Sequence, residues 1–174
     1  MVPMSFAAFL FLTPAPAQTP APPPPPVVEY SDGYRLRAKV HKIGSFAMLP
    51  LAGTEFLLGQ SLYKTSNEST KGAHVAVGAA IGTLFAVNTV TGVWNLAASR
   101  HDPNGRKKRW VHALLMLTAD AGFVATAAVA PGEREGRFAS TSTSFADQRA
   151  LHHTVALSSL VVGTAGYLVM LLGR

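Results

Sequence analysis

The sequence predicts an all-α integral membrane protein: an up-down four-helix bundle preceded by a disordered proline-rich segment. Three observations lead to this class. Only 14% of the residues are charged and 48% are hydrophobic, whereas a soluble domain carries about 25% charged residues. The charges lie almost entirely between four apolar stretches, each long enough to cross about 30 Å of hydrocarbon. The connections between these stretches are short, which favours antiparallel neighbours.

The first forty residues divide into two parts. Residues 1–17 contain a short apolar run followed by Ala15-Pro16-Ala17, a pattern typical of a cleaved or uncleaved export signal, although the usual basic start is missing. Residues 18–40 contain a proline run and a polar lead-in. A proline run cannot be helical, so we expect an extended or disordered tether.

The transmembrane domain is expected over residues 41–174, with helices at 41–63, 72–98, 110–131 and 150–172. Lys and Arg are more numerous on the side that includes the N-terminus, which favours a cytoplasmic N-terminus. A working export signal would place it outside, so the orientation stays open. We expect the bacterial inner (cytoplasmic) membrane as the location.

Charge and cysteine content narrow the partners. The net charge is +6, and because the basic residues flank apolar stretches, they indicate lipid headgroups or an anionic cofactor, with no role for nucleic acid. The chain has no cysteine, which excludes disulfides, thiolate metal sites, iron–sulfur clusters and covalently attached haem.

Each expected helix has a histidine near its start: His41, His74, His112 and the adjacent pair His152 and His153. Ionisable groups inside a membrane are costly and usually functional, although a single one can be a hydrogen-bonded packing residue. In an antiparallel bundle, His41 can face His112 on one side, and His74 can face the histidine of the last helix on the other. Two facing histidines are a common way to hold haem iron.

A basic residue lies three positions before the histidine in three of the helices: Lys71, Arg109 and Arg149. Three residues back is the same helix face, which is where a haem propionate needs a cation. The same spacing favours His152 over His153 as the ligand. The alternative is that these cations are ordinary anchors at the membrane surface.

Small and acidic residues extend the pattern along the helices. Gly59 and Gly92 each follow a histidine by eighteen positions, which is five turns of about 3.6 residues. Each glycine should therefore lie at the level of the other histidine pair, leaving room for a cofactor or for close helix packing. Glu55 and Asp120 are acids deep inside the expected spans. They either handle protons or are neutral and hydrogen-bonded.

These residues resemble the di-haem transmembrane cytochrome b family of the ascorbate- and ferric-reductase type. The resemblance covers residues 41–172 and depends on His41, His74, His112 and His152. It implies two non-covalent b-type haems, with the first and third helices ligating one and the second and fourth the other. It also implies electron transfer across the membrane from a donor to an acceptor that the sequence does not identify.

The function predicted from the sequence is thus transmembrane electron transfer, as an oxidoreductase or as an electron-relay subunit of a larger membrane complex or a homodimer. The predicted iron ligands are His41 with His112 and His74 with His152. The alternative is a haem-free four-helix membrane protein that acts as an assembly subunit or handles ions or metals.

Overall fold

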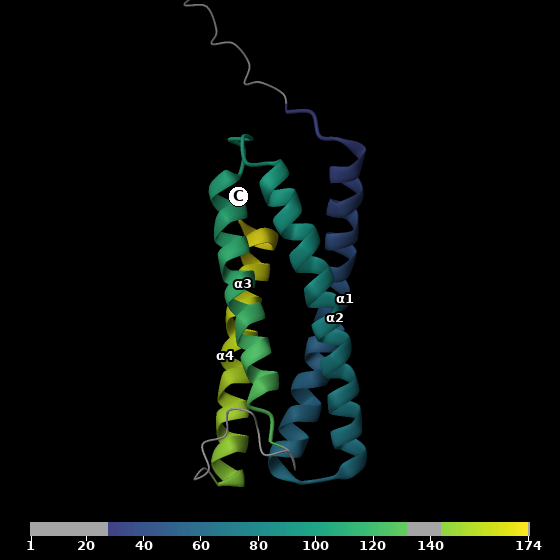
Figure 1. The fold of residues 1–174 in the computed structure, drawn as a ribbon, viewed down its shortest axis with the longest axis vertical. Coiled ribbons are helices and arrows are strands. Elements are labelled where there is room, and N and C mark those ends of the chain that lie inside the picture. The colour runs from purple at the N-terminus through teal and green to yellow at the C-terminus, as the bar shows by residue number, and fades with distance from the viewer. Residues whose placement is uncertain (1–27, 132–143, 174) are drawn as a thin grey trace, which may run out of the picture.

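The computed structural model describes residues 28–131 and 144–173, which form four α-helices and no β-strand (Figure 1). The helices are α1 (Asp32–Lys64), α2 (Glu68–Ala98), α3 (Arg106–Ala128) and α4 (Phe145–Leu172). The all-α class is therefore confirmed for this part of the chain. The predicted signal-like segment and the proline run lie outside the described residues.

Polar caps determine where three of the helices begin. The side chains of Ser31 and Asn67 accept hydrogen bonds from backbone amides in the first turns of α1 and α2. Ser144 and Asp147 form a reciprocal capping box at the start of α4. These contacts satisfy amides that a helix start leaves unpaired. Helix α1 therefore begins inside the segment predicted as a polar lead-in, and α4 begins before residue 150.

Three helices, α2, α3 and α4, are long and apolar enough to cross a membrane. They indicate a membrane protein. Helix α1 is not among them, although the sequence predicts a span over residues 41–63. It has 33 residues, which is long enough, but Ser45, Thr54, Glu55 and Gln60 interrupt its apolar stretch. Three of the four predicted spans are thus long and apolar enough to cross a membrane, and the span predicted over residues 41–63 is not.

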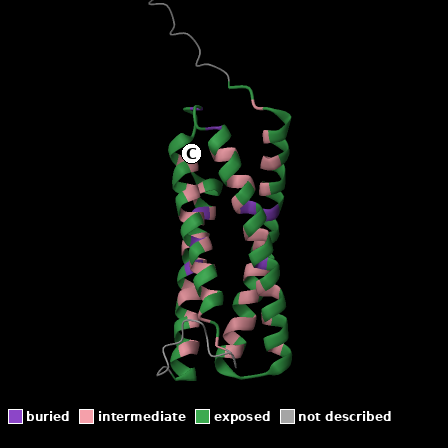
Figure 2. Cartoon of the chain, in the orientation of Figure 1, coloured by how far each residue is buried: buried purple, intermediate pink, exposed green. Residues whose placement is uncertain are grey.

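The apolar side chains of the helices point largely outward. Leu114, Val124 and Leu172 are each about two-thirds exposed or more, at 68%, 71% and 69%, and Figure 2 shows exposed positions along the outer side of every helix. Among the described residues, the buried hydrophobic side chains are Ile81 and Ala119. Large exposed apolar surfaces mark contact with a membrane or a partner, so this surface suits lipid.

The helices pack as two hairpins. Helix α1 lies along α2 and α3 lies along α4, whereas contacts between the two hairpins are few. Within the second hairpin the approach is close because the facing residues are small. A Cβ atom on Gly122 of α3 would collide with Ser159 Oγ of α4 and would lie 3.0 Å from Ser159 Cβ. Small residues of this kind let helix backbones meet in membranes.

Substituting Gly122→Ala should therefore loosen the second hairpin. Overpacking of this kind costs roughly 1–3 kcal/mol, and we expect a lower Tm for the detergent-solubilised protein, followed by circular dichroism. Gly82→Ala on α2 is the matched control, because a Cβ atom at Gly82 would meet nothing within 4 Å and alanine favours helices over glycine. Equal melting temperatures for the two variants would contradict the close packing.

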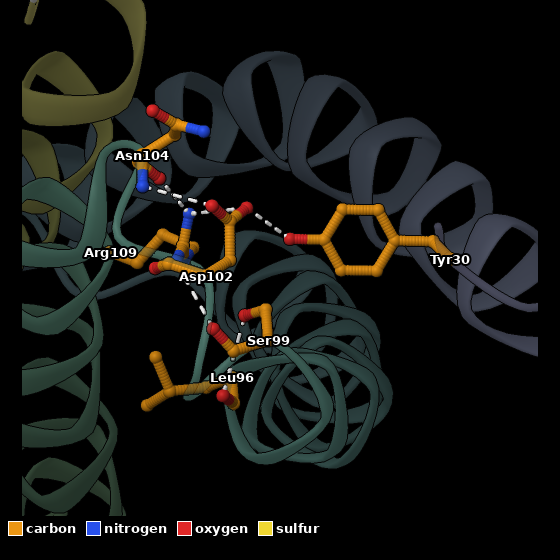
Figure 3. Close-up of polar contacts among 6 residues, drawn as sticks. All are labelled: Tyr30, Leu96, Ser99, Asp102, Asn104 and Arg109. Atoms are coloured by element: carbon orange, nitrogen blue, oxygen red, sulfur yellow. Dashed lines mark hydrogen bonds and ion pairs between the residues drawn. The ribbon is translucent and has the colours of Figure 1, made fainter. Parts of the chain in front are cut away.

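A polar cluster ties the start of the described chain to the α2–α3 connection (Figure 3). The Tyr30 hydroxyl donates to the Asp102 carboxylate, and Asn104 N donates to the same carboxylate at 2.9 Å. Arg109 Nη2 donates to the backbone oxygens of Asp102 at 2.8 Å and Ser99 at 3.2 Å. The segment before α1 is thereby held against the loop that leads into α3.

This cluster should give the stability of the protein a characteristic dependence on pH. Partial burial and then the hydrogen bond to Asp102 raise the pKa of Tyr30 to about 12, and the same bond lowers the pKa of Asp102 below its usual range. The contact therefore stabilises the fold from about pH 4 to about pH 10, between the ordinary pKa values of the two groups. It is lost as the tyrosine ionises at higher pH and as the carboxyl is protonated at lower pH.

We accordingly expect Tyr30→Phe to lower Tm at neutral pH. The difference from the unsubstituted protein should shrink as pH rises from about 10 toward about 12, because the tyrosine then loses its proton. It should also shrink as pH falls below about 4, because the Asp102 carboxyl is then protonated. Thermal unfolding across this pH range measures the effect, and a difference that does not depend on pH would contradict the assignment.

Candidate functional site

The first histidine pair joins α1 to α3. The rings of His41 and His112 lie with their centroids 6.1 Å apart and their planes at 83°. His41 Nδ1 is 2.9 Å from the Asn88 backbone oxygen, and His112 Nδ1 is 2.8 Å from the Gly166 backbone oxygen. Because a carbonyl oxygen only accepts, each Nδ1 carries the proton. Each Nε2 is then left with a free lone pair, which is the form that binds metals.

The second pair joins α2 to α4. The centroids of His74 and His152 also lie 6.1 Å apart, with the ring planes at 78°. His152 Nδ1 is 2.9 Å from the Thr126 backbone oxygen. His74 Nδ1 lies 3.0 Å from Glu55 Oε1, a carboxylate oxygen. The structure therefore brings together the two histidines of each predicted pair.

The adjacent histidine has other contacts. His153 Nε2 lies 2.8 Å from Gln60 Nε2, and its ring stacks on Tyr63 with centroids 4.3 Å apart. Of the two adjacent histidines of α4, the one that faces His74 is thus His152, the residue that the basic-x-x-histidine spacing favours.

The separation within each pair has a chemical meaning. Two imidazoles that bind one metal ion from opposite sides, each at about 2 Å, bring their ring centroids to roughly 6 Å. Each pair supplies two imidazole nitrogens, and the described residues contain no group of three or more His, Asp or Glu side chains placed to hold a bare ion. Zinc takes four ligands in structural sites, whereas haem brings its own ring nitrogens and needs two more from the protein.

A cavity of about 1560 Å³ lies between the four helices. Pockets for a single small ligand have volumes of about 300–1,000 Å³, so this space suits more than one ligand of that size. The residues around it include every predicted site residue: His41, His74, His112, His152, Lys71, Arg109, Arg149, Gly59 and Gly92.

The two predicted glycines lie beside the histidines of the neighbouring helix. A Cβ atom on Gly92 of α2 would lie 3.0 Å from His41 Cε1, which is tighter than ordinary contact. A Cβ atom on Gly59 of α1 would lie 3.6 Å from His74 Cε1, an ordinary van der Waals distance. Each glycine therefore lies at the level of the histidine pair to which its own helix does not contribute. At Gly92 there is no room for a larger side chain beside the histidine ring.

The three predicted cations have protein partners nearby. Lys71 Nζ lies 3.6 Å from Glu68 Oε2. Arg109 donates hydrogen bonds to backbone oxygens of the α2–α3 loop. Its buried Nε has no hydrogen-bond partner within the described part of the chain. Arg149 Nη2 donates to the backbone oxygens of Leu62, at 3.1 Å, and Tyr63 at the end of α1. Both arginines therefore also have a structural role that the sequence spacing does not indicate.

Comparison with known proteins gives no assignment. No protein-family model, no curated protein and no solved structure matches this chain. The geometry of the site itself must therefore carry any functional argument.

The sequence does not reveal the groups that orient the imidazoles. Three of them are backbone oxygens, of Asn88, Gly166 and Thr126, and every residue has such an oxygen. The fourth imidazole, of His74, has Glu55 as its neighbour at 3.0 Å, without a hydrogen bond. Glu55 stands out in the sequence as an acid inside a span but not as a neighbour of His74. Because these two residues belong to different helices, no local spacing connects them.

Proposed function

We propose that this protein is a transmembrane electron carrier that holds two non-covalent b-type haems. The observation that carries the proposal is the form of the two histidine pairs. In each, the rings are 6.1 Å apart, and in three of the four histidines Nδ1 faces a backbone oxygen, so that Nε2 is free for iron. Such an arrangement suits bis-histidine ligation of haem.

The proposal includes an up-down four-helix bundle that crosses a membrane, with α1 as the fourth span. Two polar residues of α1 support this reading because they have partners on other helices. Glu55 lies beside His74 of α2, and Gln60 lies beside His153 of α4. Polar groups inside a membrane are tolerated where they face the bundle interior. The bacterial cytoplasmic membrane is the proposed location.

The residues of the chain have separate tasks in this function. His41 with His112, and His74 with His152, would hold one iron each. The backbone oxygens at Nδ1 of His41, His112 and His152 fix the tautomer and the ring orientation of these three residues. Arg109 and Arg149 border the cavity, and the guanidinium group has five N–H donors. Donors that the backbone does not use can therefore meet haem propionates, as can Lys71.

When bound, each haem would supply one-electron chemistry through its iron. The two pairs use opposite ends of the bundle: the first lies near the starts of α1 and α3 and the second near the starts of α2 and α4. The protein thereby provides two redox centres for an electron that moves between a donor on one side of the membrane and an acceptor on the other. The resemblance to the di-haem cytochrome b family points to the same activity.

Absorption spectroscopy tests the proposal. The full-length protein, made in cells able to synthesise haem and purified in detergent, should show a Soret band and, after dithionite reduction, an α-band. Haem extraction should give two haems per chain. A protein without a Soret band would overturn the proposal and favour the haem-free alternative of an assembly or ion-handling protein.

The adjacent histidines of α4 provide a sharper test of the ligand set. We expect His152→Ala to lose one haem, because its ring faces His74. His153→Ala should keep both haems, because His153 contacts Gln60 and Tyr63 instead. The haem-to-protein ratio measures both effects. Loss of a haem from His153→Ala, with none from His152→Ala, would show that the ligand has been misassigned.

A further inference from the structure

The two histidine pairs differ in the group that faces Nδ1. In the first pair, both histidines face neutral backbone oxygens. In the second pair, His152 also faces a backbone oxygen, but His74 faces the carboxylate of Glu55 at 3.0 Å. One of the four imidazoles is therefore next to a group that can carry a full negative charge.

The surroundings of Glu55 leave room for its side chain beside His74. Its Oε2 and His74 Nδ1 are buried and have no hydrogen-bond partner among the described residues, so Oε1 and Nδ1 meet as an ion-pair contact. On α2, one turn beyond His74, the chain has Gly78, and a Cβ atom there would lie 2.9 Å from Glu55 Oε1. The absence of a side chain at Gly78 thus makes room for the carboxylate beside the ring.

The chemistry of the imidazole defines the role of Glu55. For Nε2 of His74 to bind iron, the proton must be on Nδ1, which lies 3.0 Å from the Glu55 carboxylate. A negative charge at this distance attracts the positive charge on the ring more strongly than a neutral backbone oxygen does. It therefore makes the imidazole a better electron donor to the metal. A better donor favours the more positively charged, oxidised iron.

We propose that Glu55 is a positioning residue for His74 and makes the haem of the His74–His152 pair harder to reduce than the haem of the His41–His112 pair. This inference rests on the proposed function. It assigns a direction to electron flow within the bundle: at equilibrium an electron favours the His41–His112 end. The reduction potentials of the two haems differ because one of four otherwise similar histidines has a charged neighbour.

A redox titration of the full-length protein in detergent, monitored at the α-band, tests the proposal. The unsubstituted protein should titrate as two one-electron components. In Glu55→Gln the midpoint potential of the lower-potential component should rise by about 59 mV, which is a tenfold change in the reduction equilibrium of a one-electron couple. The midpoint potential of the other component should not change. The component that shifts should be the one that His152→Ala lacks.

Asp120→Asn is the matched control for removing an acid from inside the bundle. The Asp120 carboxylate accepts a hydrogen bond from Thr89 and is not the group that faces a histidine Nδ1. Both components should keep their potentials in this variant. An equal shift in Asp120→Asn and Glu55→Gln would overturn the proposal, because the effect would then follow from net charge alone.

Gly78→Ala gives a second, independent variant should Glu55→Gln lose haem. The new Cβ atom would displace the carboxylate from His74, so the same component should shift upward. Two haems with potentials that neither Glu55→Gln nor Gly78→Ala changes would overturn this inference and leave the proposed function intact. A protein without any haem would overturn both, and the absorption spectrum distinguishes these results.

Discussion

Replacing either His41 or His112 with alanine is expected to remove the same haem and to leave the other in place. The two rings come from different hairpins and face each other at 6.1 Å, so each should supply one of the two protein ligands to a single iron. Each variant should therefore contain half of the haem of the unsubstituted protein. The double variant should lose no more than either single one.

Haem-to-protein ratios and redox titration together check this result. The component lost from His41→Ala should have the same potential as the one lost from His112→Ala. His101→Ala is the control, because His101 is an exposed loop residue that contacts Arg100. If His41→Ala and His112→Ala remove components of different potential, the proposed pairing is wrong.

The second large effect is expected at Gly92. A Cβ atom there would lie 3.0 Å from His41 Cε1, so Gly92→Ala should push the His41 ring away from His112. Overpacking costs roughly 1–3 kcal/mol, which corresponds to about a tenfold weaker retention of the cofactor for each 1.4 kcal/mol. Gly92→Ala should thus lose the haem that His41→Ala loses.

Gly59→Ala is the natural comparison. Its Cβ would meet His74 Cε1 at 3.6 Å, an ordinary contact distance, so this variant should keep both haems. Competition with a haem-binding apoprotein, followed in the Soret band, measures retention in the two variants. If Gly59→Ala loses haem and Gly92→Ala does not, clearance around the rings does not control binding.

The sequence predicts the helices more accurately than their ends. Four helices follow from the apolar stretches, but α1 begins at Asp32 and α4 at Phe145, because the caps at Ser31 and Ser144 act before the apolar stretches begin. Hydropathy alone locates the part of a helix that would lie in lipid. It does not locate the polar turns that extend the helix into water.

The candidate site could be predicted in part because it follows from helix direction. Alternation of direction is enough to place His41 near His112 and His74 near a histidine of α4. The partners of Nδ1 could not be predicted, since backbone oxygens have no sequence signal and the contact of Glu55 with His74 depends on how α1 and α2 turn about their axes. The local partners of Arg109 and Arg149 depend on loop geometry in the same way.

The hairpin packing has a consequence for how such a protein is assembled. Each hairpin has its own close internal contacts, yet it supplies only one imidazole to each histidine pair. Neither hairpin alone contains both histidines of a pair, so the haems of the proposed function would bind only where the two hairpins meet. Insertion of the helices and binding of the haems would then be separate steps, and haem binding would join the two hairpins.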